Sequence, residues 1–339
     1  MRSLQKQREH NRALCAVPRG IALALFYAVF ALFITPLSTH TKEKQVVIVR
    51  QSSNESSERL IKGFKIYLSR QGIKPELSIF TTSEIHLHDT QLTDSIRSLQ
   101  PQLIVTIGSN LTRTISAAIT DIPIVFGAVF QPEISGFVRS RLRPGSNVTG
   151  ASLDIPPEIQ FKYFKLVHPG LRRLGVIHSA EMNDLVKQAQ QAAASAGIEL
   201  FAIPVKKGVT GGIERAVYSA LDTLLGQIDG LWSLSDPTVF SQTNTRMILT
   251  RTLRERVPFM GFSSTVVASG ALFALDFDYK DIGRQVGRLS ERILRGESPS
   301  TLPVTRPGVI WLYYNENTAR QVSIDIPEEF EAVAKKVYK

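Results

Sequence analysis

From residue 45 onward, short runs of β-branched and apolar residues alternate with polar stretches that have the spacing of amphipathic helices. The first apolar runs are residues 45–50, 103–107 and 123–126, and the first helical stretch is residues 56–70. Uninterrupted apolar strands that alternate with helices are typical of βαβ units around a buried parallel sheet. The pattern therefore predicts an α/β fold.

The same alternation begins again after Gly150, which predicts a second unit of the same kind. We expect strands at 173–178, 198–203, 229–234, 257–262, 271–277 and 309–314, and helices at 155–167, 181–196, 212–225, 241–254, 282–294 and 328–337. The chain is long enough for two domains of ordinary size. We therefore expect two doubly wound parallel-sheet lobes joined by multiple crossovers. Residues 42–150 form lobe one and residues 151–277 form lobe two, and a segment of about 278–339 returns to lobe one.

The N-terminus has the layout of an export signal. Five basic residues lie within residues 1–19, and residues 21–34 are almost wholly apolar. A basic start followed by an apolar helix is typical of a signal peptide, and the positive-inside rule keeps the N-terminus in the cytoplasm. The apolar part lies between the length of a signal core and the roughly 20 residues that span a bilayer.

Three interpretations of this segment stay open. Residues 1–41 are a cleaved signal peptide, an uncleaved membrane anchor that attaches the chain through residues 20–41, or a buried core helix. Under the first two, the rest of the chain lies in the periplasm or another extracytoplasmic space, either free or anchored to the inner membrane.

Charge and cysteine content indicate which kinds of binding site the chain lacks. The formal net charge is +10, and without residues 1–41, which hold five basic residues and one acidic residue, 35 basic and 29 acidic residues leave +6. The basic residues are scattered and no aromatic residues interleave with them, so we expect no nucleic-acid binding. The single cysteine, Cys15, lies in the N-terminal segment. The remainder can therefore form neither a disulfide nor a cysteine metal site.

Sequence motifs for catalysis and for phosphate binding are absent. The chain has no GxGxxG after a strand, no GxxxxGK[ST], no GxSxG and no HExxH. His86 and His88 would share one face of a strand, but they lie in a polar connector without further ligands at a recognisable spacing, which favours a surface loop. The glycine cluster at 208–212 is interpreted as a helix start. We therefore expect no enzyme, no metal and no cofactor.

Polar residues follow the apolar strands directly in both halves of the chain. In the first half of the chain they lie at 50–54 and 108–110, and Gly127 and Ala128 follow a further strand. In the second half they lie at 179–183, 235–236 and 263–264. Helix capping is the commonest role of Ser, Asn and Asp at such positions. The carboxyl ends of the strands surround the ligand crevice in open α/β sheets. The recurrence at so many strand ends therefore favours a ligand cleft between the two units.

Four segments carry a resemblance to a known family. They are PIVFGAVFQP (123–132), SNVTGAS (146–152), ALFALDFDYKDIGRQVGRLSERILRGESPSTLPV (271–304) and NENTARQVSIDIP (315–327). From about Gln45 to Phe330 the chain resembles the ABC-transporter substrate-binding protein family of the type I periplasmic-binding fold, in the branch that includes aromatic-amino-acid binders. The resemblance implies two lobes that close over a small solute, and it implies the transmembrane subunits of an ABC permease as a partner.

The resemblance also implies which strand-end residues bind the ligand. It indicates nine of them: Ser52, Ser53, Ser109, Asn110 and Ala128 in lobe one, and Glu181, Asn183, Asp236 and Ser263 in lobe two. The family often has an Asn-Pro pair where this chain has His178–Ser179. That departure predicts that the hinge side of the second lobe binds something different.

Two functions from different classes follow from these observations. The leading hypothesis is an extracytoplasmic solute-binding protein of an ABC import system, whose ligand is an amino acid or a related zwitterion. The alternative is a membrane-anchored ligand-sensing lobe that signals to a partner protein. We further expect Ser109 to cap a helix at 110–119. Asp236 is expected either to cap a helix that begins at Pro237 or to bind a ligand ammonium group.

Overall fold

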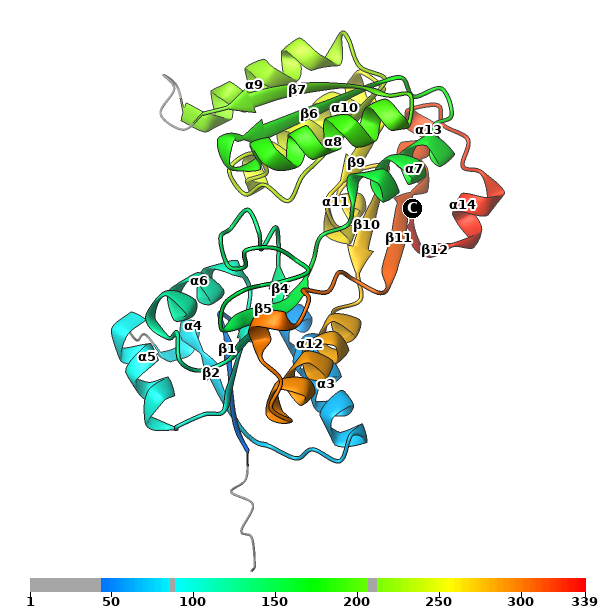
Figure 1. Cartoon of the computed structure of the whole chain (residues 1–339). Coiled ribbons are helices and arrows are strands. Elements are labelled where there is room, and N and C mark those ends of the chain that lie inside the picture. The colour runs from blue at the N-terminus through cyan, green and yellow to red at the C-terminus, as the bar shows by residue number, and fades with distance from the viewer. Residues whose placement is uncertain (1–43, 86–88, 207–211) are drawn as a thin grey trace, which may run out of the picture. The chain divides into compact units, whose positions relative to one another are not determined.

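The computed structural model describes residues 44–85, 89–206 and 212–339. Within these ranges the chain forms two separate sheets, each packed against helices (Figure 1). The predicted α/β fold of two lobes with mainly parallel sheets is confirmed. The predictions for residues 1–41, for His86 and His88 and for residues 208–211 concern positions outside the described residues.

The first sheet is parallel and has five strands in the order β2-β1-β3-β4-β5. The strands are β1 (Gln45–Arg50), β2 (Glu76–Thr81), β3 (Leu103–Ile107), β4 (Ile124–Val129) and β5 (Val148–Ser152). Side chains alternate along a strand between the two faces of its sheet. Val46 and Ile48 therefore enter one core cluster, and Val47 and Val49 enter another.

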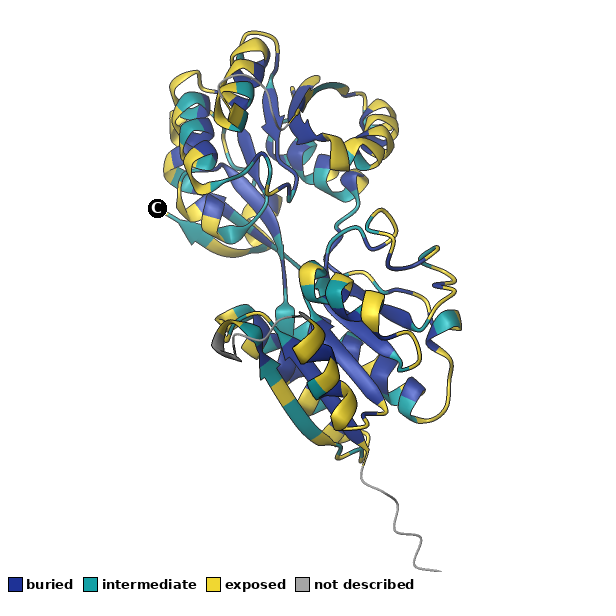
Figure 2. Ribbon diagram, turned by 90° about the vertical axis from the view of Figure 1, so that its left-hand side faces the viewer, coloured by how far each residue is buried: buried dark blue, intermediate teal, exposed yellow. Residues whose placement is uncertain are grey.

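Helices cover both faces of this sheet. One face packs against α3 (Glu55–Arg70) and α12 (Tyr279–Leu294), and the other packs against α5 (Asp89–Ser98) and α6 (Ser109–Ala118). The short α4 (Thr82–Ile85) follows β2. In Figure 2 the inner strands of this sheet are dark blue between helices whose outer sides are yellow, as expected for a sheet that is buried on both faces, and the edge strand β2 is mostly teal and yellow.

Two glycines allow α3 and α12 to pack backbone against backbone. A Cβ atom built on Gly283 would lie 1.9 Å from the carbonyl oxygen of Leu60, and one built on Gly63 would lie 2.1 Å from that of Lys280. Real Cβ atoms do not approach this closely, so only glycine fits at these two positions. The helix α12 therefore lies closer to α3 than larger residues would permit.

The second sheet has seven strands in the order β12-β11-β10-β9-β8-β6-β7. The strands are β6 (Arg173–Ser179), β7 (Glu199–Val205), β8 (Gly230–Trp232), β9 (Phe259–Gly261), β10 (Phe273–Phe277), β11 (Ile310–Asn315) and β12 (Ala334–Tyr338). All neighbouring pairs are parallel except β10 with β11. The helices are α7 (Pro157–Val167), η1 (Ala180–Met182), α8 (Asn183–Ser195), α9 (Gly212–Leu225), α10 (Gln242–Arg254), α11 (Ser264–Ala268), α13 (Glu316–Gln321) and α14 (Glu328–Ala332).

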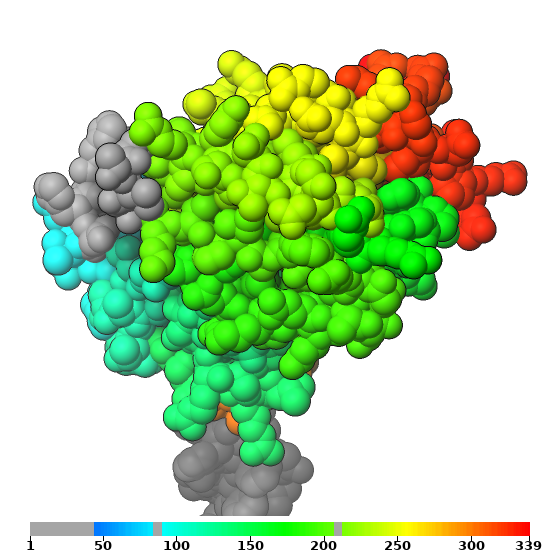
Figure 3. All heavy atoms as spheres, turned by 90° about the horizontal axis from the view of Figure 1, so that it is seen from above, coloured from blue at the N-terminus to red at the C-terminus, as the bar shows by residue number. Residues whose placement is uncertain are grey.

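The returning segment is divided between the lobes, which corrects the expectation that all of 278–339 belongs to lobe one. Helix α12 and the short η2 (Pro299–Thr301) pack on the first lobe, but β11 and β12 extend the second sheet. The side chains of β11 explain this placement, because Leu312 and Tyr314 enter the same core cluster as Phe330. In Figure 3 the C-terminal residues (red) lie against the region of α10 (yellow), where Gln321 donates to the Leu253 carbonyl.

Three connections link the two sheets in the described chain: residues 153–156, Asp278, and residues 306–309. Two of them are joined directly, because Asp278 N–H donates to the Val309 carbonyl at 3.4 Å. Just before the crossings at 153–156 and 306–309, Ser152 N–H donates to the Thr305 carbonyl at 2.9 Å, and Thr305 N–H donates to the Gly150 carbonyl at 3.0 Å. Among the described residues, none of the helices is both long enough and apolar enough to span a bilayer.

Candidate ligand-binding site

A cavity of about 650 Å³ lies at the carboxyl ends of the central strands of the second sheet. We call it the main cavity. From the second lobe it is lined by Ser235, Asp236, Pro237, Phe240, Phe262, Ser263, Ser264, Thr265, Asp276, Phe277, Trp311 and Tyr313, and from the first lobe by Glu55, Ser56, Arg59, Phe130 and Tyr279. Residues of both lobes therefore enclose one cavity.

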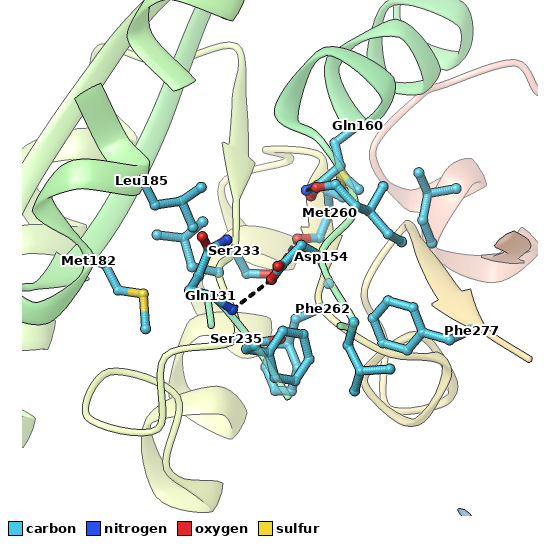
Figure 4. A pocket seen from close by; sticks show the side chains of 16 residues that line it. Gln131, Asp154, Gln160, Met182, Leu185, Ser233, Ser235, Met260, Phe262 and Phe277 are labelled. Carbon is cyan, nitrogen blue, oxygen red and sulfur yellow. Dashed lines mark hydrogen bonds between the residues drawn. The ribbon is translucent and has the colours of Figure 1, made fainter. Parts of the chain in front are cut away.

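A smaller pocket of about 60 Å³ adjoins the main cavity. The two share the lining residues Phe130, Ser235, Phe262 and Phe277. Figure 4 shows this small pocket, with Met182 and Leu185 from the region of η1 and α8, Gln160 from α7, and Met260 from β9 around it. Because four residues belong to both linings, the small pocket and the main cavity are adjacent compartments.

The strand order explains why the second-lobe residues meet. Strands β8, β9 and β10 are neighbours and run parallel, so their carboxyl ends lie at the same edge of the sheet. Residues 235–236 follow β8, residues 262–264 follow β9, and Asp276 lies near the end of β10. Ligand crevices of open α/β sheets form at such an edge.

The main cavity has an unusually aromatic lining. Seven of its described lining residues are aromatic: Phe130, Phe240, Phe262, Phe277, Tyr279, Trp311 and Tyr313. The rings of Phe130 and Phe277 meet edge to face with centroids 5.9 Å apart, and those of Phe240 and Phe262 are 5.3 Å apart. Rings in such arrangements offer both faces and edges to a further aromatic group.

Two carboxylates in this lining are held by backbone N–H groups. Asp236, which is 2% exposed, accepts hydrogen bonds from Ser179 N–H at 2.7 Å and from Thr238 N–H at 3.0 Å. Asp276 is half-buried and accepts from Ser264 N–H at 2.9 Å and from Phe277 N–H at 2.8 Å. Neither set of bonds involves a cationic side chain.

The cationic side chain in the lining is already engaged. The Arg59 guanidinium donates to the Asp278 carboxylate at 3.2 Å and lies 5.0 Å from the centre of the Trp311 ring. A second cation, Lys335, lies 4.7 Å from the same ring. A ligand in the main cavity therefore meets aromatic and acidic groups, while Arg59 stays paired with Asp278 and Trp311.

Two tyrosines of the main cavity stay protonated at neutral pH. Burial, with a further contribution from the Asp276 carboxylate, raises the pKa of Tyr313 to about 12. Burial and Asp276 also raise the pKa of Tyr279. Both phenols are therefore neutral.

A buried ion pair fixes the crossover beside the small pocket. Asp154 accepts a hydrogen bond from Gln131 N–H at 2.8 Å, drawn as the dashed line in Figure 4, and pairs with Arg141. Burial raises the pKa of the Asp154 carboxyl, against the opposing effects of Gln131 N–H and Arg141. The pair joins the crossover at 153–156 to the loop that follows β4.

The structure places two of the nine expected ligand-binding residues in the main cavity, Asp236 and Ser263. The other seven line neither of these two pockets: Ser52, Ser53, Ser109, Asn110, Ala128, Glu181 and Asn183. In lobe one, Ser53 donates to the Glu58 carboxylate, and Ser52 accepts from Asn54. In lobe two, the neighbouring Met182 lines the small pocket.

Two expected helix caps are wrong. Helix α6 begins at Ser109 itself, and its N-cap is Gly108, whose φ of +96° is a conformation that glycine adopts readily. After Asp236, residues 237–239 form a turn, and α10 begins only at Gln242 with Ser241 as its cap. Asp236 therefore closes a turn and binds the end of β6.

The His178–Ser179 pair lies at the carboxyl end of β6. Both residues are buried, and the N–H of Ser179 binds Asp236. They line neither of the two pockets. That the hinge side of the second lobe binds something different stays a prediction.

Sequence reasoning missed Arg59, Asp276, Trp311 and Tyr313. Asp276 lies within β10, and the search for polar residues considered only positions after the strands. In β11, Trp311 and Tyr313 alternate with the buried Leu312 and Tyr314. Because side chains alternate between the two faces of a strand, this pattern indicates that Trp311 and Tyr313 face away from the core cluster that contains Leu312 and Tyr314.

Comparisons with known proteins show the family to which the sequence is similar. A family model described as ABC transporter substrate binding protein matches residues 44–338. The chain is 28% identical over 291 residues to the tyrosine-binding protein of Clostridioides difficile strain R20291, which covers 84% of this chain and 82% of that protein.

Solved structures share the fold at low sequence identity. A domain from Streptococcus pneumonia in complex with L-Trp is similar with a TM-score of 0.66 and 20% identity, over 87% of this chain and 99% of that one. The ligand-free, open form of a substrate binding protein with adhesive properties from Clostridium difficile is similar with a TM-score of 0.72 and 20% identity, over 87% of this chain and 100% of that one.

Proposed function

Because the chain belongs to the ABC transporter substrate binding protein family, we propose that it is an extracytoplasmic solute-binding protein of an ABC import system. The ligand occupies the main cavity, and the two lobes close around it because the closed form binds it more tightly. The three connections between the sheets serve as the hinge. The transmembrane subunits of an ABC permease recognise the closed form.

The proposed ligand is an aromatic amino acid. The observation that carries this proposal is the lining of the main cavity, which combines seven aromatic side chains with the carboxylates of Asp236 and Asp276. The similarity to a tyrosine-binding protein supports it. In this proposal Asp236 binds the ligand ammonium, since buried charges in proteins are paired and hydrogen-bonded.

The first-lobe residues at the strand ends complete the site when the lobes close. Ser52 and Ser53 follow β1, Ser109 and Asn110 follow β3, and Ala128 lies near the end of β4. These three strands are adjacent and parallel, so the residues lie at one edge of the first sheet. Glu181 and Asn183, beside Met182, would close the small pocket from the opposite lobe.

A ligand screen by thermal shift tests the proposal. A ligand present at one hundred times its dissociation constant adds about 2.7 kcal/mol to the free energy of unfolding. We expect L-tyrosine, L-tryptophan or L-phenylalanine to raise the melting temperature, and sugars and inorganic anions to leave it unchanged. A shift with sugars or anions and none with aromatic amino acids would refute the aromatic-amino-acid ligand.

The N-terminal segment decides between a diffusing and an anchored protein. We expect N-terminal sequencing of the exported protein to find a start near Lys42, because the basic and apolar run before it has the layout of a signal peptide. An intact Met1 on a chain retained in the membrane would instead support attachment through residues 20–41. That result would favour a membrane-anchored ligand-sensing lobe that signals to a partner protein.

A further inference from the structure

The two carboxylates that the second lobe contributes to the main cavity lie at separate positions along its wall. Asp236 follows β8 and Asp276 lies near the end of β10, with β9 between these strands. Neighbouring strands are about 4.8 Å apart, so the two positions are separated by roughly 10 Å of sheet edge. One ligand can therefore meet the two acids at opposite ends.

The Asp276 carboxylate has acceptor capacity left for a ligand. Each of its oxygens accepts one backbone hydrogen bond, from Ser264 N–H and from Phe277 N–H. An ionised carboxylate has about four acceptor positions, so each oxygen keeps one. Asp276 is half-buried and lines the main cavity, whereas Asp236 is 2% exposed.

The surroundings of Asp276 suit an aromatic ring. Phe277 follows it in the chain, and Tyr279, Trp311 and Tyr313 line the same part of the cavity. The Asp276 carboxylate acts on both phenols, because it contributes to the raised pKa of Tyr313 and of Tyr279 after burial. This end of the cavity therefore offers ring contacts beside the Asp276 carboxylate.

We propose that Asp276 accepts a hydrogen bond from a donor on the ring edge of the ligand, so that the cavity selects an aromatic amino acid with a ring O–H or N–H. This inference rests on the proposed function, with the ligand ammonium at Asp236. The phenol of tyrosine and the indole N–H of tryptophan supply such a donor, and phenylalanine does not. Hydrogen bonds to an ionised acceptor are about twice as strong as neutral ones.

The preference for tyrosine over phenylalanine depends on the ring hydroxyl that phenylalanine lacks. A site that hydrogen-bonds a substrate hydroxyl discriminates strongly against the analogue without it when its own polar group is left unpaired. Asp276 is only half-buried, and water can partly replace the missing donor. We therefore expect L-tyrosine to bind at least tenfold more tightly than L-phenylalanine and than L-4-fluorophenylalanine.

Isothermal titration of the whole protein with these three ligands and with L-tryptophan tests the inference. In the Asp276→Ala variant, the ratio of tyrosine to phenylalanine affinity should fall to about one. The ratio is the readout because the loss of the two backbone hydrogen bonds of Asp276 weakens both ligands alike. Asp276→Asn retains an uncharged acceptor and should give an intermediate ratio of tyrosine to phenylalanine affinity, which keeps the test available if the alanine variant does not fold.

The possible failures are distinguishable. The inference fails, and the proposed function stands, if tyrosine and phenylalanine bind the wild-type protein equally well. The same holds if the Asp276 variants keep the wild-type ratio of tyrosine to phenylalanine affinity. If none of these aromatic amino acids binds, the proposed function fails and the inference fails with it.

Discussion

Asp236→Asn is expected to weaken binding of an aromatic amino acid at least thirtyfold, which corresponds to about 2 kcal/mol for a buried charge pair that loses one partner. The same variant should also lower the free energy of unfolding of the ligand-free protein by about 1–3 kcal/mol. Both oxygens of Asp236 accept backbone N–H bonds, from Ser179 and Thr238. An asparagine has one acceptor oxygen, so its NH₂ group would face one of these donors.

This second effect separates the observed role of Asp236 from that of a simple helix cap, which asparagine fills as well as aspartate. Isothermal titration gives the affinity and urea denaturation gives the stability. Asp184→Asn is the matched control, because its carboxylate is 67% exposed in the same lobe and pairs with Lys187. Wild-type affinity in Asp236→Asn would remove the ammonium assignment, and unchanged stability would contradict the two backbone bonds.

Gly283→Ala should produce the largest loss of stability, about 3 kcal/mol, at the upper end of the usual cost of overpacking. The added Cβ would lie 1.9 Å from the Leu60 carbonyl oxygen and 2.9 Å from the Phe64 nitrogen. Both neighbours are backbone atoms, so no side chain can rotate away to make room. The two helices must separate, and the core between them opens.

Gly226→Ala is the control for this substitution. A Cβ at Gly226 would meet nothing within 4 Å, and its φ is not in the left-handed region. Alanine there should leave stability unchanged or raise it slightly, because it restricts the unfolded chain. Equal denaturation midpoints for Gly283→Ala and wild type would mean that α3 and α12 do not pack at this distance.

The alternation of strands and helices predicted the fold class because each element carries its own burial pattern. It did not predict which sheet β11 joins. The alternation along β11 requires burial of one face of the strand, and this requirement alone does not select a sheet. The choice depends on contacts distant in sequence, with Phe273 of β10 opposite Tyr314. The expected helix at 328–337 also ends early, since β12 pairs with β11 from Ala334 onward.

Only part of the candidate site could be predicted from the sequence. The rule that ligands meet the carboxyl ends of parallel strands led to Asp236 and Ser263, which both line the main cavity. It could not lead to Trp311, because β11 runs antiparallel to β10. The beginning of β11, where Trp311 lies, is therefore next to the carboxyl end of β10. It could not lead to Arg59 either, since a side chain on α3 reaches this cavity only through the packing of one lobe beside the other.

The position of α12 in the chain has a consequence for how the protein matures. Domains generally fold as units during synthesis, with the N-terminal one first. Here the five strands of the first sheet end at Ser152, but Ile282, Val286 and Leu289, which cover one face of that sheet, come after all of β6 to β10. A nascent chain that ends before residue 279 has α3 on this face but exposes the part that α12 covers. The two lobes must mature together, and incomplete chains should be the species that chaperones retain and proteases remove.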